Sequence, residues 1–240
     1  MTSRPLPPAG TVYLHLLSLP RTPEEIAGLR AHLAPDELAR AARLKSAPVA
    51  ERYIASRGLL REILGGYLGV VAGQVRLVTR QGGKPCLAQG GGRLHFNLAH
   101  AGPHFLLAVA SDRAVGVDLE CIDPEKSLTQ MARLIFSEAE LAQWERLATS
   151  RRVEAFYRCW VRKEACLKGN GTGLALPASG IELFAPDWQA IPVVDCGQRR
   201  WQLFEIAAPP GYCAALAVEC RGEQQPPPQL VWIDQENFGE

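Results

Sequence analysis

One order of elements occurs twice along this chain and constrains its fold more than any other feature. Apolar residues at a spacing near 3.6 predict a long helix over 49–68, and a second long helix is predicted over 153–168, ending at Gly169. Three apolar stretches that predict strands follow each helix. They are 75–79, 94–99 and 105–110 after the first helix, and 180–184, 201–206 and 212–218 after the second. The chain is therefore expected to be an α+β protein.

This repetition predicts two similar lobes related by an approximate twofold axis, at residues 1–113 and 114–240. Each lobe would pack a small, mainly antiparallel sheet against its long helix. The strand Phe105–Ala110 resembles Ala214–Val218, although the sequence identity between the halves is slight. The lobes would join near residues 111–120 and leave a cleft between them, and ligands tend to bind in clefts of this kind.

Composition indicates an ordinary globular chain without a strong attraction to polyanions. Of its 240 residues 47% are hydrophobic and 21% charged, and the net charge of +1 makes neither nucleic acid nor a membrane an expected partner. No stretch is long and apolar enough to span a bilayer. The polar, proline-rich start lacks a signal-peptide pattern, and the seven cysteines form no C-x-x-C pair. We expect a reduced, cytoplasmic protein without a zinc site.

Two carboxylates lie in the region where the lobes would join. Gly116–Glu120 is predicted to be a strand, and it places Asp118 and Glu120 two residues apart. Residues two apart in a strand point to the same face, so these carboxylates would stand side by side and repel each other unless a cation lies between them. A solvent-exposed strand face is the simpler alternative, because most charged side chains are exposed.

A second set of functional side chains lies on the predicted helix over 153–168. Trp160, Glu164 and Lys168 follow one another at intervals of four residues and so share one face. With Asp118 and Glu120 they could bring three carboxylates and one lysine together. Oxygen ligands of this kind hold a hard divalent cation, here against a diphosphate. Lys168 could equally form only a salt bridge with Glu164, one helical turn away.

Other polar residues could have either a functional role or a purely structural one. His100 ends a strand before a turn, where it could bind a phosphate or simply a turn carbonyl. His95 and His104 have spacings that fit no standard set of metal ligands. A basic series could clamp an anion or could form the solvated surface of a helix. It consists of Arg40, Arg43, Lys45, Arg52, Arg57 and Arg61.

Six motifs, taken in order, resemble those of the Sfp-type 4′-phosphopantetheinyl transferases. They are Ala55–Leu60 with Arg57, Gly83–Pro85, Phe96–His100, Gly116–Glu120, Phe136–Glu140, and Trp160–Ala165 extended to Lys168. No single motif is specific, but together they span about residues 43–176. The family has two similar α+β lobes in one chain, in agreement with the repetition. Where the family often has a serine before the histidine, this chain has Ala99, so one hydroxyl contact to phosphate would be missing.

The resemblance implies a role for each matching residue. The ligands of Mg²⁺ would be Asp118, Glu120 and Glu164. The residues that hold coenzyme A would be Arg57, Lys84 and His100, with Arg43 and Lys45 as further basic contacts. Lys168 matches the lysine near the transferred diphosphate. Glu164 and Lys168 would therefore be the catalytic pair.

The activity that the resemblance implies is transfer of phosphopantetheine from coenzyme A to a serine of an apo acyl or peptidyl carrier protein. The serine hydroxyl would attack the phosphorus nearer the pantetheine, and 3′,5′-ADP would leave. Glu164, directly or through a water, would accept the proton, and Lys168 would stabilise or protonate the leaving phosphate. A carboxylate bound tightly to Mg²⁺ is a poor base, so the identity of the proton acceptor stays open.

The resemblance also bears on partners and on alternative functions. Carrier proteins present an acidic helix, and a basic surface is expected to receive it. The candidates are Arg151, Arg152, Arg158 and Arg162. A chain with two lobes supplies its own cleft, so we expect a monomer. Two alternatives are a Mg²⁺-dependent hydrolase of coenzyme A or another nucleotide diphosphate, and a module that binds coenzyme A or a carrier without turnover.

Overall fold

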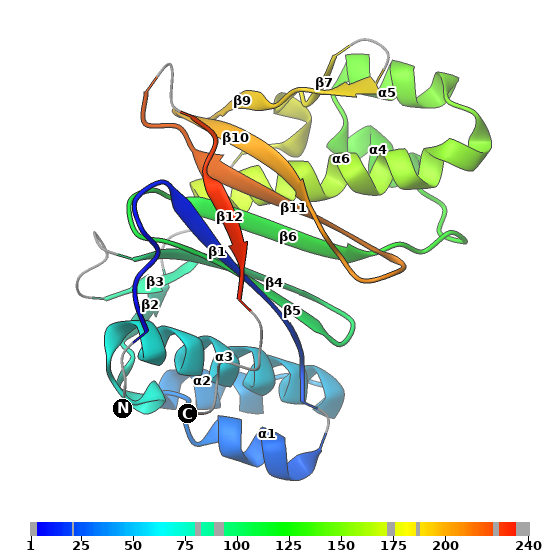
Figure 1. Ribbon diagram of the computed structural model, residues 1–240. Coiled ribbons are helices and arrows are strands. Elements are labelled where there is room, and N and C mark those ends of the chain that lie inside the picture. The colour runs from blue at the N-terminus through cyan, green and yellow to red at the C-terminus, as the bar shows by residue number, and fades with distance from the viewer. Residues whose placement is uncertain are drawn as a thin grey trace.

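The computed structural model describes residues 4–20, 22–79, 83–88, 94–171, 176–185, 188–222 and 226–233 (Figure 1). The helices in these ranges are α1 (Pro23–Arg30), α2 (Pro35–Ala42), α3 (Ala47–Leu68), α4 (Thr129–Ile135), α5 (Glu138–Arg146) and α6 (Thr149–Asn170). The strands are β1 (Thr11–Ser18), β2 (Leu77–Thr79), β3 (Pro85–Leu87), β4 (His95–Ala101), β5 (His104–Ala110), β6 (Val115–Cys121), β7 (Phe184–Ala185), β8 (Gln189–Ala190), β9 (Val193–Cys196), β10 (Arg199–Ile206), β11 (Tyr212–Glu219) and β12 (Gln229–Trp232). None of the helices in the described ranges has the length and apolar character that crossing a membrane requires.

Two four-stranded sheets form the centre of the fold. The first has the strand order β12-β1-β5-β4, and the second has the order β6-β11-β10-β9. Neighbouring strands in both sheets are antiparallel except for β1 and β12, which are parallel, with Thr11 opposite Gln229. The last described strand therefore returns to the sheet that the first half of the chain builds. Two short hairpins, β2–β3 and β7–β8, pair separately.

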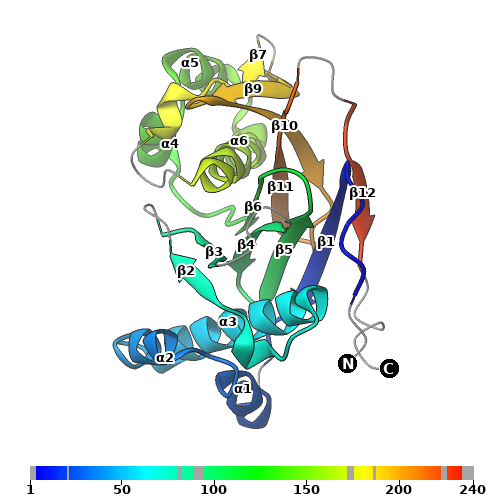
Figure 2. The same cartoon turned by 90° about the vertical axis from the view of Figure 1, so that its left-hand side faces the viewer.

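The elements stack in four layers, with the two sheets between two groups of helices. Figures 1 and 2 show α1, α2 and α3 on one side of the sheets and α4, α5 and α6 on the other. In β5, the odd-numbered residues from Phe105 to Val109 pack with side chains of α3, and the even-numbered residues from Leu106 to Ala110 pack with those of β6 and β11. Successive residues of a strand face opposite sides, so this continuously apolar strand is buried on both.

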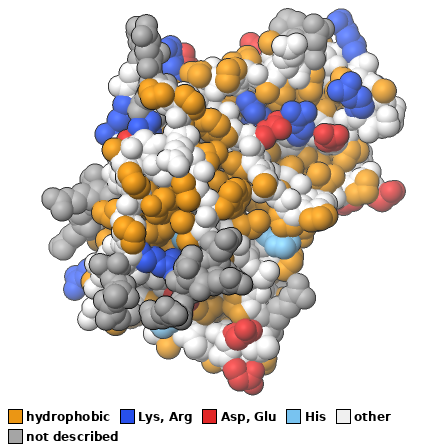
Figure 3. All heavy atoms as spheres, in the orientation of Figure 1, with side chains coloured by type: hydrophobic (Ala, Val, Ile, Leu, Met, Phe, Trp, Pro, Cys, Tyr) orange, Lys and Arg blue, Asp and Glu red, His pale blue; other side chains and the backbone are white. Residues whose placement is uncertain are grey.

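The core that the two sheets share reaches the surface on one face of the molecule. Phe204, Ile206 and Leu230 are partly buried and pack against this shared core. On the face drawn in Figure 3, hydrophobic side chains gather over the middle of the molecule, where Figure 1 shows the two sheets next to each other. The edge between the sheets is thus apolar on this face.

Strand β6 and helix α6 approach each other closely at Gly116. A Cβ atom added to Gly116 would collide with the backbone of Ala165 and of Gly169 in α6. A Cβ atom on Gly169 would in turn collide with the ring of Trp201 in β10. Only glycine permits such close contacts. Because Gly116, Asp118 and Glu120 alternate along β6, the two carboxylates share the face of β6 that packs on α6.

The predicted α+β class is confirmed, whereas several element boundaries differ from the predictions. Helix α6 begins at Thr149 and continues through Gly169 to Asn170, because Gly171, at φ 75°, supplies the left-handed residue that ends it. The strand predicted at 180–184 is wrong, since a 3₁₀ turn occupies Ala178–Gly180 and only Phe184 belongs to a strand. The strand predicted at 75–79 begins at Leu77, after a 3₁₀ turn.

Candidate active site

A cavity of about 680 Å³ lies between elements of the first half of the chain and elements of the second. One part of its wall comes from α2, α3, the β2–β3 hairpin and β4, and the other part comes from α4, α6 and residues 176–178. Charged side chains of both signs line it. They are Asp36, Glu37, Arg40, Arg57, Lys84, Glu164 and Lys168. The cavity is therefore lined by charged side chains from segments that lie far apart in the sequence.

Next to the cavity, a buried aspartate of β6 pairs with a lysine of α6. Lys168 Nζ donates a hydrogen bond of 2.5 Å to Oδ1 of Asp118. The side chain of Asp118 is 3% exposed, whereas that of Lys168 is 34% exposed. Oδ2 of Asp118 is buried without a hydrogen-bond partner. Burial raises the pKa of Asp118, and Lys168 opposes part of that shift. An exposed strand face is therefore the wrong interpretation for Asp118.

Two further carboxylates lie near Asp118. Glu120 accepts a hydrogen bond of 3.1 Å from the indole Nε1 of Trp160. Glu164, one helical turn beyond Trp160, lines the cavity. Burial raises the pKa of Glu164, and the negative charges of Asp118 and Glu120 raise it further. The strand and the helix thus present their acidic residues to one region, where the charge of Glu120 disfavours ionisation of Asp118 and of Glu164.

The three carboxylates have the donor chemistry of a site for a hard divalent cation. Within the ranges that the structure describes, no three histidine, cysteine or carboxylate side chains already form a ligand set. Asp118 and Glu120 are instead hydrogen-bonded to Lys168 and Trp160. Asp118 nevertheless offers a buried oxygen without a partner, and burial together with the charges of Asp118 and Glu120 raises the pKa of Glu164. Both features suit a cation that is bound by oxygen ligands. The assignment of these three carboxylates as its ligands stays a prediction.

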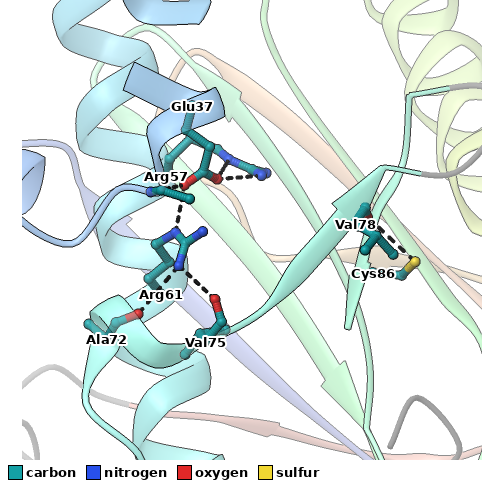
Figure 4. A network of polar contacts seen from close by, with 8 residues as sticks. Glu37, Arg57, Arg61, Ala72, Val75, Val78 and Cys86 are labelled. Carbon is teal, nitrogen blue, oxygen red and sulfur yellow. Dashed lines mark hydrogen bonds and ion pairs between the residues drawn. The ribbon is translucent and has the colours of Figure 1, made fainter. Parts of the chain in front are cut away.

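On the opposite side of the cavity, a buried glutamate holds two arginines (Figure 4). Glu37 Oε1 accepts a hydrogen bond of 2.6 Å from Nε of Arg57, and its Oε2 accepts one of 2.7 Å from Nε of Arg61. Arg61 also donates to the carbonyl oxygen of Val75 at 2.7 Å. The side chains of Arg61 and Glu37 are 2% and 4% exposed. Arg57 lines the cavity at a fixed position, whereas Arg61 is part of the core and not of a solvated helix surface.

Lys84 and His100 also line the cavity, and their contact with coenzyme A stays a prediction. Nζ of Lys84, just before β3, donates hydrogen bonds to the carbonyl oxygens of Val115 at 3.1 Å and Gly169 at 2.9 Å. These bonds join the β2–β3 hairpin to β6 and α6. Desolvation lowers the pKa of His100, and the charges of Lys168 and Arg52 lower it further. The imidazole is therefore neutral at pH 7.

The structure does not bring every predicted contact to this cavity. Arg43 and Lys45 are exposed in the connection between α2 and α3 and are not among the residues that line the cavity. Their role toward coenzyme A stays a prediction. The sequence did not indicate the role of Glu37, whose carboxylate fixes Arg57.

The basic surface predicted on α6 needs one correction. Arg162 is 3% exposed, because its guanidinium lies over the ring of Phe184 and donates to the carbonyl oxygen of Ile191 at 2.8 Å. Its placement on an exposed docking surface is therefore wrong. Arg158 is partly exposed and pairs with Glu205 at 2.6 Å.

Asn97 is a second residue whose role the sequence did not reveal. Its Oδ1 accepts a hydrogen bond of 2.8 Å from the backbone N–H of Val117, and the residue is 5% exposed. It lines the cavity and links β4, at the edge of one sheet, to β6, at the edge of the other. A lone amide in an apolar strand could have signalled this link, because buried amides find hydrogen-bond partners.

The chain matches a family model and several relatives. Residues 114–217 match the family model described as the 4′-phosphopantetheinyl transferase superfamily. The chain is 36% identical over 218 residues to the 4′-phosphopantetheinyl transferase HetI of Nostoc sp., a match that covers 89% of this chain and 90% of that protein. It is 31% identical over 185 residues to a putative 4′-phosphopantetheinyl transferase of Synechocystis sp., covering 74% of this chain and 73% of that one. It is 24% identical over 166 residues to the 4′-phosphopantetheinyl transferase Sfp of Bacillus subtilis, covering 69% and 72%.

Proposed function

Because the chain belongs to the 4′-phosphopantetheinyl transferase superfamily, we propose that it transfers phosphopantetheine from coenzyme A to a serine of an apo acyl or peptidyl carrier protein. One observation carries the proposal. Glu164 and Lys168 line the same cavity, and Lys168 is bonded to the buried Asp118 of β6. A carboxylate and an ammonium group in one cavity support Glu164 as the proton acceptor and Lys168 as the cation beside a diphosphate.

The cationic groups of the cavity suit a ligand that carries several phosphates. Arg40, Arg57 and Lys84 come from the first half of the chain, and Lys168 comes from the second. The guanidinium of Arg40 lies 5.5 Å from the ring centroid of Tyr53, which orients it toward the same space. Charge-assisted bonds from such groups would hold the phosphates of coenzyme A, with His100 as a neutral hydrogen-bonding partner.

We assign Asp118, Glu120 and Glu164 as the residues that hold Mg²⁺. The buried Oδ2 of Asp118 without a partner supports the assignment. When bound, the cation would offset negative charge on the phosphate oxygens and on the leaving group. Lys168 and Trp160, which now bond to two of these carboxylates, would keep them oriented toward the cavity wall.

In the reaction, the serine oxygen forms a bond to the phosphorus nearer the pantetheine, and the bond from that phosphorus to the bridging oxygen breaks. The proton of the hydroxyl would pass to Glu164, directly or through a water, and a Glu164 that binds Mg²⁺ would favour the route through the water. Lys168 stabilises the charge that develops on the leaving 3′,5′-ADP, or protonates it. The products are the holo carrier protein and 3′,5′-ADP.

The proposal also covers the arrangement of the two halves of the chain and the oligomeric state. The two halves, 1–113 and 114–240, would be lobes related by an approximate twofold axis, because α3 with its sheet corresponds to α6 with its sheet. The parallel pairing of β12 with β1 would cross this boundary and clamp the lobes together. We further propose that the protein acts as a monomer in the cytoplasm, where reduced cysteines persist.

The consumption of coenzyme A, measured with and without apo carrier protein, tests this function. We expect 3′,5′-ADP to appear only with the carrier, and in equal amount to holo carrier. Release of free phosphopantetheine without a carrier would instead favour the hydrolase. Binding of coenzyme A with no turnover on carriers of the acyl and peptidyl types would favour a binding module.

A further inference from the structure

Strand β6 has one edge that none of the described strands covers. It is the edge strand of its sheet, and among the described strands it pairs with β11 alone. Glu219 of β11 donates its backbone N–H to the carbonyl oxygen of Ala114, and bonds between antiparallel strands fall on every second residue. The backbone groups of Val115 and Val117 therefore point away from β11. Both residues are 0% exposed, so these groups need partners other than water.

Two side chains from the first half of the chain supply these partners. Oδ1 of Asn97, in β4, accepts a hydrogen bond of 2.8 Å from the backbone N–H of Val117. Nζ of Lys84 donates one of 3.1 Å to the carbonyl oxygen of Val115. The same ammonium group donates one of 2.9 Å to the carbonyl oxygen of Gly169, in the last turn of α6, where a positive charge suits the helix dipole. Side chains thus bind this edge of β6 in the way that a neighbouring strand would.

The hydrogen bond of Asn97 lies next to the proposed cation ligands. Val117, which donates it, is the residue before Asp118. On β4, Asn97 comes three residues before His100, and both line the cavity. Asn97 is 5% exposed, so the bond is shielded from competing water and is strengthened by its surroundings. It therefore fixes the strand that carries the carboxylates relative to the strand that carries His100.

The role of Asn97 can be separated from that of the charged residues. Lys84 also holds β6, but its charge would attract a phosphate, so its removal would affect ligand binding as well as position. Asn97 is neutral, and its amide oxygen is directed at Val117. A neutral substitution at Asn97 therefore removes a contact to β6 and leaves the net charge of the cavity as it was.

We propose that Asn97 is a positioning residue for the divalent cation. By holding the N–H of Val117, it keeps Asp118 and Glu120 where they can bind Mg²⁺ together with Glu164. The inference rests on the proposed function, which names this cation and these ligands. Groups that hold metal ligands from behind contribute strongly to metal affinity, although they do not touch the metal.

The variant Asn97→Leu tests the proposal, because it keeps a side chain of similar size but lacks the accepting oxygen. The readout is the Mg²⁺ concentration that gives half of the rise in Tm, measured without substrates. We expect this concentration to increase about tenfold, the lower end of the usual loss when a group behind the metal ligands is removed. The Mg²⁺ concentration for half-maximal transfer should increase to the same extent. The Kd for coenzyme A, measured by calorimetry in EDTA, should stay unchanged.

Gln143→Leu is the matched control. Oε1 of Gln143 accepts a hydrogen bond of 3.3 Å from the backbone N–H of Trp188, and Gln143 is outside the residues that line the cavity. Both substitutions remove an amide that binds a backbone N–H, but only the one in β4 should change the Mg²⁺ requirement. Asn97→Asp keeps an accepting oxygen, so it should restore most of the wild-type response to Mg²⁺. Should Asn97→Leu fail to fold, Asn97→Ala removes the same oxygen without adding bulk and is measured in its place.

Two results would overturn the positioning role while leaving the transferase intact. One is an unchanged Mg²⁺ requirement in Asn97→Leu, and the other is a tenfold rise in the Kd for coenzyme A in EDTA, which would make Asn97 a contact of coenzyme A. A wild-type protein whose Tm does not respond to Mg²⁺ would overturn the cation site and the positioning role together. A wild-type protein that responds to Mg²⁺ but modifies no carrier would overturn the transferase alone.

Discussion

Lys168 of α6 and Asp118 of β6, 50 residues apart in the chain, are joined by a hydrogen bond of 2.5 Å beside the cavity. The pair connects the two elements that carry the acidic residues. Gly116 makes this possible, because it lets the backbones of β6 and α6 approach closely enough for the side chains to meet.

Replacing Lys168 with alanine should slow transfer much more than it weakens coenzyme A binding. Its ammonium would act mainly on charge that develops as the phosphate leaves, so we expect kcat to fall at least about 100-fold. The Kd for coenzyme A should change by no more than about threefold, because the proposed contacts of Arg40, Arg57 and Lys84 with the phosphates would remain. Equal losses in kcat and in affinity would make Lys168 a binding residue only.

Replacing Asp118 with asparagine should remove the response to Mg²⁺ while keeping the fold. The substitution preserves shape but removes the buried charge, so the Tm in chelator should change little. Mg²⁺ should raise the Tm of the wild-type protein and not that of Asp118→Asn, because a cation stabilises only a state that binds it. Asp195→Asn, at an exposed ion pair with Arg200, is the control and should keep the Mg²⁺ response. A normal Mg²⁺ shift in Asp118→Asn would disprove the ligand assignment.

The substitution Gly116→Ala should destabilise the protein by about 3 kcal/mol, the upper end of the usual cost of overpacking. Its Cβ would meet backbone atoms of Ala165 and Gly169, which cannot rotate away as side chains do. Gly28→Ala in α1 is the matched control, because nothing lies within 4 Å of its added Cβ. That change should stabilise the protein by about 0.5–1 kcal/mol. Urea unfolding measures both, and similar effects in the two variants would contradict the close packing.

Glu37→Ala and Arg57→Ala should have different effects. Removing Glu37 leaves the buried Arg61 without its carboxylate, at a cost of about 3–5 kcal/mol in unfolding free energy. Removing Arg57 leaves the Glu37–Arg61 pair in place, so stability should fall less while the Kd for coenzyme A rises. Urea unfolding and calorimetry would show the contrast. An Arg57→Ala protein with unchanged affinity would mean that Arg57 serves only to pair with Glu37.

Stability should fall as the pH is lowered from about 6.5 to 4, because of His15. Burial, with the charge of Arg4 nearby, lowers the pKa of His15 to about 4, whereas the unfolded chain has a pKa near 6.5. In this window the unfolded chain binds a proton that the folded one does not, so the unfolding free energy drops by roughly 3 kcal/mol. His15→Phe should lose this part of the pH dependence, and His32→Phe, at a partly exposed histidine, should keep it. Identical pH profiles for the two variants would contradict the assignment.

The sequence was sufficient for features that depend on local periodicity. The 3.6-residue spacing predicted α3, and intervals of two and four residues predicted that Asp118 and Glu120 share a strand face and that Trp160, Glu164 and Lys168 share a helix face. These patterns fix side-chain direction without knowledge of distant partners.

Features that depend on distant partners could not be predicted. Arg61 and Arg162 lie on predicted helices and carry charges, yet both are buried. Arg61 donates a hydrogen bond to Glu37, and Arg162 donates one to the carbonyl oxygen of Ile191. No local pattern in the sequence reveals these acceptors. The return of β12 to β1 pairs Thr11 with Gln229, and no signal within either short strand specifies the other. Helix α6 ends at Gly171 and not at Gly169, because Gly171 adopts the left-handed conformation that ends the helix.

The most direct test of the central claim is the intact mass of an apo carrier protein after incubation with this protein, coenzyme A and Mg²⁺. The acidic cluster and Lys168 are claimed to carry the transfer, so we predict a gain of one phosphopantetheine per carrier. EDTA should abolish the gain, renewed Mg²⁺ should restore it, and Asp118→Asn should lack it under all conditions. A full mass gain in EDTA, or with Asp118→Asn in place of the wild-type protein, would contradict the claim.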